Sequence, residues 1–91
     1  MDAQANIVDG DITDQTRLVL RRTADTLAEC GARMDQVIRV GVWLANLDDF
    51  DEFNMEYAKH FVESLPVRSC VQAQLYRGAL VEIEVQAFVT S

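Results

Sequence analysis

The stretch VIRVGVWLAN, residues 37–46, is dominated by β-branched and other apolar residues, which are typical of a strand inside a sheet. A helical pattern follows it, in which Asp48 or Asp49 can cap the first turn. Its aromatic side chains recur at helical spacing: Phe50, Phe53, Tyr57 and Phe61. The sequence therefore predicts a strand followed directly by an amphipathic helix.

A second strand is predicted for residues 67–75, within the stretch LPVRSCVQAQL at 65–75. Pro66 ends the preceding helical region, and apolar and polar side chains then alternate as on a half-buried strand. A strand, a helix and a strand in this order should form a right-handed crossover with parallel strands. Residues 37–75 thus predict the centre of a mixed α/β fold.

Another helix is predicted before this unit. Asp11 or Thr13 can cap it, Gly31 can end it, and residues 1–10 are expected to be an irregular lead-in. Its inward positions at helical spacing are Ile12, Thr16, Val19, Leu20, Thr23, Leu27 and Cys30.

A turn at residues 76–79 leads into a last predicted strand at 80–90, LVEIEVQAFVT. After a turn this short, the strand should return antiparallel. We expect a single domain over residues 1–91, of the α/β (α+β) class, in which two helices cover one face of a mixed sheet.

The two faces of this predicted sheet differ in character. The row expected under the helices is apolar: Ile38, Val40, Val42, Leu44, Val67, Val71, Ala73, Leu75, Val81, Ile83, Val85, Ala87 and Val89. The opposite row is mixed: Val37, Arg39, Gly41, Trp43, Ala45, Arg68, Cys70, Gln72, Gln74, Leu80, Glu82, Glu84, Gln86 and Phe88. This second face is too polar for a monomer core but suits a subunit interface, because it also carries large apolar groups. We expect neighbouring copies to cover it in a closed ring of three sheets.

Composition narrows the classes of function. The chain has 91 residues and a net charge of −7, and its basic residues are scattered, which argues against nucleic acid as the main partner. No apolar run is long enough to span a membrane, and the acidic start lacks a signal-peptide core, so a cytoplasmic location is expected. Cys30 and Cys70 lack CxxC spacing and a nearby histidine, so we predict reduced thiols and no metal site.

Four stretches of the chain resemble the RidA/YjgF family of reactive-intermediate imine deaminases. They are GDITDQTR at 10–17, VIRVGVWLANLDDFDEFNMEYAKHF at 37–61, PVRSCVQ at 66–72 and GALVEIEVQAF at 78–88. The resemblance implies a chorismate-mutase-like fold and a homotrimer with ligand clefts between subunits. It also implies hydrolysis of 2-imino or 2-enamino acids, such as 2-aminoacrylate and 2-iminobutyrate, to 2-keto acids and ammonia without a cofactor or metal.

The same resemblance implies roles for three side chains. Arg68 matches the arginine that clamps the substrate carboxylate, and the planar guanidinium fork suits that geometry. Glu82 matches the glutamate that holds the attacking water, and a carboxylate there can act as general base. Cys70 matches a cysteine that lines the pocket.

Other interpretations of these residues stay open from the sequence alone. Arg68 can equally be an interface arginine paired with an acidic neighbour. Cys70 can be a nucleophile if Arg68 lowers its pKa, although a pocket-lining or buried thiol is the simpler interpretation. Cys30 is expected in the helix core, Asn54 is assigned a structural role, and His60 lacks the partners of a metal ligand.

The sequence departs from typical family members at its N-terminus, where they carry a β-hairpin with Gly-Pro-Tyr-Ser and Ser-Gly-Gln segments. Because this sequence lacks those segments, we expect part of the usual pocket to be missing and a bare sheet edge at either Val37–Asn46 or Leu80–Thr90. The alternative to a deaminase is therefore a non-catalytic member that binds small carboxylates or a partner protein. A ribonuclease, an activity attached to the family name, fits the charge of −7 poorly.

Overall fold

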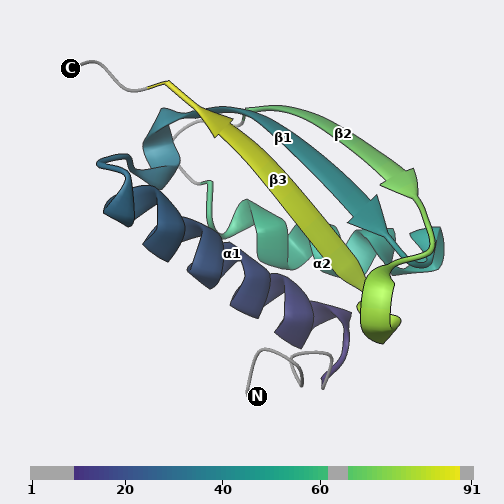
Figure 1. The fold of residues 1–91 in the computed structure, drawn as a ribbon. Coiled ribbons are helices and arrows are strands. Elements are labelled where there is room, and N and C mark those ends of the chain that lie inside the picture. Colours follow the sequence, from purple (N-terminus) through teal and green to yellow (C-terminus); the bar gives the residue numbers. More distant parts are fainter. Residues whose placement is uncertain (1–9, 62–65, 89–91) are drawn as a thin grey trace.

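The computed structural model describes residues 10–61 and 66–88, in which two helices lie against one side of a curved sheet (Figure 1). The predicted order of helix, strand, helix, strand and strand is confirmed. The elements are α1 (Ile12–Glu29), β1 (Val37–Leu44), α2 (Phe50–Ala58), β2 (Val67–Gln72) and β3 (Val81–Ala87).

The strands lie in the order β2-β1-β3. As predicted, β1 pairs in parallel with β2, across the crossover through α2, and antiparallel with β3. Strand β1 is therefore the central strand and is paired along both of its edges, whereas β3 lies at an edge of the sheet. On the face of β1 that lies under the helices, Val40, Val42 and Leu44 are fully buried. The mixed sheet with two helices on one face matches the predicted fold class.

Helix α1 begins and ends where the sequence predicts. The Asp11 carboxylate accepts a hydrogen bond from the Asp14 backbone N–H at 2.9 Å and so caps the first turn. After the last turn, Gly31 adopts a φ of +80°, which favours glycine. Cys30 is exposed at the C-cap, so its prediction as a core residue is wrong, because the helix ends before another turn can cover it.

The aromatic stripe predicted for the second helix is confirmed, although α2 ends at Ala58 and Phe61 lies beyond it. Successive ring centroids from Phe50 through Phe53 and Tyr57 to Phe61 lie 6.4, 5.4 and 4.7 Å apart. The last three rings are buried in the core between the helices and the sheet. Asp49 occupies the N-cap position, although its side chain makes no capping hydrogen bond.

A register shift in β1 reverses one predicted position. The pairing of β1 with β3 is irregular between Val37 and Arg39, as at a β-bulge. Val37 consequently lies in the core and Ile38 is 54% exposed, whereas the alternation predicted the opposite. From Val40 onward the predicted alternation of β1 holds.

The face predicted for β2 is wrong, and this correction decides where the site lies. Arg68 stands beside Val40 and Cys70 beside Val42, so this polar row faces the helices. Val67 and Val71 point to the open face and are 69% and 48% exposed. The two faces of this edge strand differ little in hydrophobicity, so the contacts with α2 decide which face turns toward the helices.

The end of β2 and the turn after it also differ slightly from expectation. Strand β2 stops at Gln72, and a short 3-10 turn occupies Tyr76–Gly78. Within it Arg77 has a φ of 58° and Gly78 a φ of 73°, which reverses the chain into β3. The predicted lead-in and the end of the last strand fall largely on residues 1–9 and 89–91, outside the described residues.

Candidate functional site

Arg68 is held against α2 by three contacts. Its Nη1 donates a hydrogen bond to the side-chain oxygen of Asn54 at 2.6 Å. Its guanidinium carbon lies 4.7 Å from the ring centroid of Tyr57 and 5.4 Å from that of Phe50. The aromatic faces attract the cation and fix its position without using its N–H donors.

The guanidinium also lines a cavity and has no acidic partner in the part of the chain that the structure describes. The cavity, of about 340 Å³, is bordered by Asn54, Tyr57, Ala58, Pro66 and Arg68. Across residues 10–61 and 66–88, no carboxylate lies within ion-pair distance of Arg68. The ion-paired interpretation of Arg68 therefore gains no support, and the arrangement is suited to an incoming anion.

Cys70 shares the helix-facing side with Arg68, two residues along β2. Burial raises the pKa of its thiol, and the nearby Arg68 charge only partly offsets that effect. A thiol with a raised pKa is protonated near neutral pH and is a poor nucleophile. The raised pKa and the contact of Cys70 with the core thus favour a buried thiol over a nucleophile, and its place in a ligand pocket stays a prediction.

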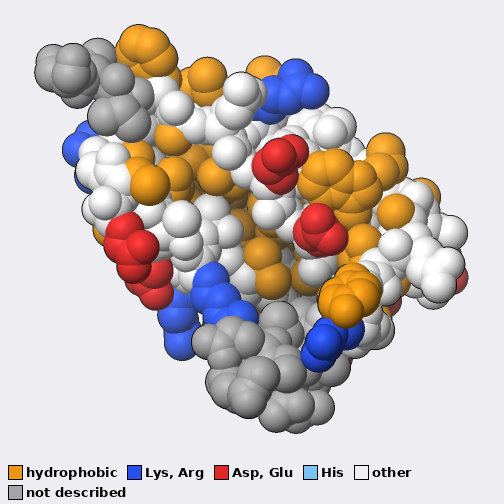
Figure 2. All heavy atoms as spheres, viewed as in Figure 1, with side chains coloured by type: hydrophobic (Ala, Val, Ile, Leu, Met, Phe, Trp, Pro, Cys, Tyr) orange, Lys and Arg blue, Asp and Glu red, His pale blue; other side chains and the backbone are white. Residues whose placement is uncertain are grey.

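Glu82 lies on the other side of the sheet from Arg68. It pairs with Trp43 of β1, and Glu84 pairs with Gly41, so both carboxylates project from the open face. Figure 2 shows acidic side chains standing among hydrophobic ones over the strands. The two residues predicted to share one substrate are therefore not brought together within a single chain.

The open face has its own hollow, of about 330 Å³, between β1, β2 and β3. Its lining combines charged and aromatic side chains: Arg39, Gly41, Trp43, Ser69, Glu84, Val85 and Gln86. The Trp43 ring lies across Gly41, where a Cβ atom would come within 3.1 Å of the ring. With the exposed Val67 and Val71 beside it, this face keeps the mixed character predicted for a subunit interface.

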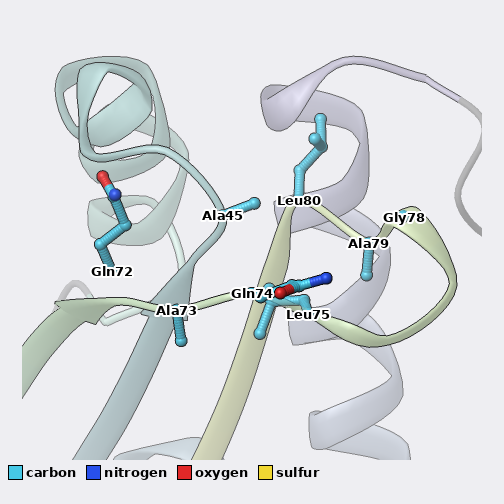
Figure 3. Close-up of a pocket in the computed structure, with 8 residues that line it drawn as sticks. All are labelled: Ala45, Gln72, Ala73, Gln74, Leu75, Gly78, Ala79 and Leu80. Atoms are coloured by element: carbon cyan, nitrogen blue, oxygen red, sulfur yellow. The ribbon is translucent and has the colours of Figure 1, made fainter.

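The larger cavity, of about 670 Å³, lies at the end of the sheet (Figure 3). It is formed where β1 and β2 end and β3 begins, by Ala45, Gln72, Ala73, Gln74, Leu75, Gly78, Ala79 and Leu80. None of these side chains is charged, and the Gln72 side-chain oxygen is already occupied by the Leu47 backbone N–H at 2.9 Å. This cavity is therefore a weaker candidate for a carboxylate ligand than the one beside Arg68.

A cluster of titratable side chains between the two helices was not predicted from the sequence. Glu56 is 3% exposed, and its carboxylate accepts hydrogen bonds from Arg17 at 3.3 Å and pairs with His60 at 3.0 Å and Lys59 at 3.4 Å. Burial would raise the pKa of Glu56, but these partners outweigh it and lower the pKa from 4.5 to about 2. The cluster ties α1 to α2 and leaves Glu56 no open position for a ligand.

Two further residues of α2 were predicted without a functional role. Asn54 was assigned a structural role, and Tyr57 a place in the aromatic stripe, yet both contact Arg68. The signal was present in the sequence: in a crossover unit, the connecting helix packs on the strands that it joins, so its polar residues can meet polar residues of β2.

Among the described residues, no group of three or more His, Cys, Asp or Glu side chains is placed to hold a metal ion.

Comparison with known proteins identifies the family. The family model described as Endoribonuclease L-PSP matches residues 1–89. The chain belongs to this family, also called YjgF/RidA. The fold class predicted from the resemblance, a chorismate-mutase-like α+β fold, is thereby confirmed.

Three relatives illustrate the range of the L-PSP family. A RutC family protein of Pyrococcus horikoshii is 42% identical over 83 residues, covering 90% of this chain and 66% of that protein. The mitochondrial protein Mmf1 of Saccharomyces cerevisiae is 40% identical over 81 residues, covering 88% and 56%. The 2-iminobutanoate/2-iminopropanoate deaminase of Mus musculus is 33% identical over 83 residues, covering 90% and 62%. The chain thus spans 56–66% of the length of these relatives.

A solved structure in the family carries a small molecule. The crystal structure of E. coli TdcF with bound serine matches this fold with a TM-score of 0.85 and 32% sequence identity. The match covers 89% of this chain and 67% of TdcF.

In the present chain, no helix among the described residues combines the length and apolar character needed to cross a bilayer.

Proposed function

We propose that Arg68 binds the carboxylate of 2-imino or 2-enamino acids and that the assembled protein hydrolyses them to 2-keto acids and ammonia. The observation that carries this proposal is the Arg68 guanidinium, which lines a cavity and is bonded to a neutral amide in place of an acid. The similarity to a mouse protein named as a 2-iminobutanoate deaminase supports the substrate class. The serine bound in TdcF, itself a small amino acid, agrees with a site of this size.

The chemistry needs one bound carboxylate and one base. Arg68 fixes the carboxylate, which places the neighbouring imine carbon within reach of water. Glu82 accepts a proton from the water as the C–O bond forms, while the C=N electron pair moves to nitrogen, and Glu82 then returns this proton to the nitrogen. In the resulting carbinolamine, the hydroxyl proton then passes through Glu82 to the amino nitrogen. The C–N bond breaks with its electron pair going to nitrogen, the carbonyl forms, and ammonia leaves. Imino acid and water are thus consumed, and keto acid and ammonia are formed, with no cofactor in the proposal.

Since Arg68 and Glu82 project from opposite faces, the proposal requires that each site take the two residues from different copies. Their positions also differ by three residues along β1, or about 10 Å. We therefore propose a homotrimer in which the open face of one copy closes the Arg68 cavity of the next. The exposed Val67 and Val71 would be buried in that assembly.

A turnover assay tests the proposed reaction. The 91-residue chain is incubated with 2-iminobutyrate generated in situ, and semicarbazone formation reports the remaining imine. We expect accelerated loss of imine with the wild type, none above background with Arg68→Ala, and full activity with Arg21→Ala, which removes an exposed arginine of α1. Equal activity of Arg68→Ala and the wild type would contradict the proposal.

A mixing experiment tests whether the site is shared between copies. Chains with Arg68→Ala and chains with Glu82→Gln are each expected to be inactive. When they are unfolded and refolded together, sites that combine the intact Arg68 of one chain with the intact Glu82 of another should restore part of the activity. The absence of any restoration, in a mixture with the solution mass of three chains, would contradict a shared site.

A non-catalytic carboxylate-binding protein is the second candidate. The separation of Arg68 and Glu82 on opposite faces favours it, because a single chain then holds a clamp without a base. Saturable binding of 2-ketobutyrate that depends on Arg68, without acceleration of imine loss, would select this candidate. Under either function we propose a cytoplasmic protein without a nucleic-acid partner, which cell fractionation and an RNA-binding assay can test.

A further inference from the structure

We infer that Asn54 is a positioning residue that orients Arg68 while leaving its positive charge to the ligand. This inference rests on the proposed role of Arg68 as the carboxylate clamp. It concerns a side chain that need not touch the substrate, because its effect passes through the guanidinium.

The contacts show how the orientation is achieved. The Asn54 amide oxygen accepts from one terminal nitrogen of Arg68 at 2.6 Å, and the Tyr57 and Phe50 rings hold the guanidinium carbon. All three partners project from α2, so a single rigid element sets the position of the cation. Guanidinium has five N–H donors, and Asn54 engages one terminal nitrogen, so donors remain for a carboxylate at the cavity.

Glu56 lies two residues after Asn54 on the same helix and also binds an arginine, but with a charged side chain. Glu56 carries a full negative charge and binds the guanidinium of Arg17 as an ion pair. At position 54 the acceptor has nearly the same shape as aspartate but no charge. A carboxylate at position 54 would neutralise the Arg68 charge within the protein, and a small apolar side chain would leave the guanidinium free to rotate. The amide of Asn54 holds the guanidinium in place and leaves its charge uncompensated.

Binding measurements on a matched set of variants test the inference. The dissociation constant of 2-ketobutyrate is measured by calorimetry, and KM and kcat for 2-iminobutyrate by the semicarbazone assay. Asn54→Asp should raise Kd and KM about tenfold or more, since a charge-assisted interaction with the ligand is lost to an internal one. Asn54→Ala should raise them several-fold while Tm stays close to that of the wild type. Met55→Glu adds the same charge at a neighbouring, 70% exposed position of α2 and should leave both constants unchanged.

The outcomes separate this inference from the proposed function. If Arg68→Ala binds 2-ketobutyrate as the wild type does, the proposed function is wrong. If Arg68→Ala loses binding while Asn54→Asp retains wild-type affinity and KM, the proposed function stands and the role of Asn54 is overturned.

A measurement without ligand completes the test. Rotation about the Nε–Cζ bond of Arg68 can be followed by NMR on protein with labelled arginine. It should be slow in the wild type, slower still in Asn54→Asp and fast in Asn54→Ala. Equal rates in the three proteins would also overturn the inference, because Asn54 would then not hold the guanidinium at all.

Discussion

Glu56, a residue of α2, and Arg68, which packs against α2 from β2, have different kinds of partner. Glu56 is buried and is hydrogen-bonded or ion-paired with Arg17, Lys59 and His60, which lower its pKa to about 2 against the effect of burial. Arg68, against the same helix, receives an amide and two aromatic rings and lies at a cavity. The Glu56 charge is compensated by partners that join the two helices, whereas the Arg68 charge is held in place without an acidic partner among the described residues. The difference separates a structural charge from one available to a ligand.

The largest expected effect concerns binding through Arg68. Arg68→Ala should weaken 2-ketobutyrate binding by about 100-fold or more, because a bidentate, charge-assisted contact is lost. The free energy of unfolding should fall by no more than about 1 kcal/mol, the scale of the cation–π contacts. Isothermal calorimetry and urea unfolding measure the two effects. Arg68→Lys keeps the charge without the planar fork, so its affinity should lie between those of the wild type and Arg68→Ala. Wild-type affinity in Arg68→Ala would show that the Arg68 charge does not bind the ligand.

Glu56→Gln should produce the opposite result. Removing the charge leaves Arg17, Lys59 and His60 without their common partner and should lower the free energy of unfolding by about 2 kcal/mol. This figure is discounted because Arg17 and Lys59 are partly exposed to solvent. Affinity for 2-ketobutyrate should stay at the wild-type value. Unchanged stability in this variant would mean that the cluster does not join the helices.

Stability should also depend on pH through Glu56. Its pKa is about 2 in the folded chain and near 4.5 when unfolded, so the unfolded state binds the proton first as the pH falls. The stabilisation is therefore fully present above about pH 4.5 and is lost progressively toward pH 2. Urea unfolding at several acidic pH values should show this loss in the wild type. The slope should be shallower in Glu56→Gln, and parallel slopes would contradict the assignment.

The smallest effect is expected at the Tyr57 hydroxyl. This oxygen is buried and has no hydrogen-bond partner in the described part of the chain. Tyr57→Phe keeps the ring beside Arg68 but removes an unsatisfied polar group, so stability should stay the same or rise by up to about 1 kcal/mol. Thermal unfolding measures the change. A clear loss of stability would show that the hydroxyl has a partner after all.

Much of the fold follows from local patterns in the sequence. The Asp11 cap, the Gly31 stop, the aromatic stripe of α2 and the parallel crossover were all predictable, because each depends on nearby residues or on chain connectivity. The burial of Val37 and the exposure of Ile38 were not predictable, because a β-bulge at one end of the strand shifts the alternation without a signal in the sequence.

The candidate site was predictable in its residues but not in their arrangement. Alternation correctly places Arg68 and Cys70 on the same side of β2, yet it cannot say which side faces α2. That choice depends on contacts between β2 and the connecting helix, above all the bond from Arg68 to Asn54. The separation of Arg68 from Glu82 follows directly from that choice and the pairing register.

NMR titration of the arginine side chains with 2-ketobutyrate can show whether Arg68 is available to a carboxylate ligand. With labelled arginine, we expect a saturable shift of the Arg68 guanidinium signals at ligand concentrations where those of the exposed Arg21 stay unchanged. Glu56→Gln should show the same Arg68 response. Equal, non-saturating shifts at both arginines, or none at Arg68, would show that Arg68 is no more available to a carboxylate than any arginine on the surface.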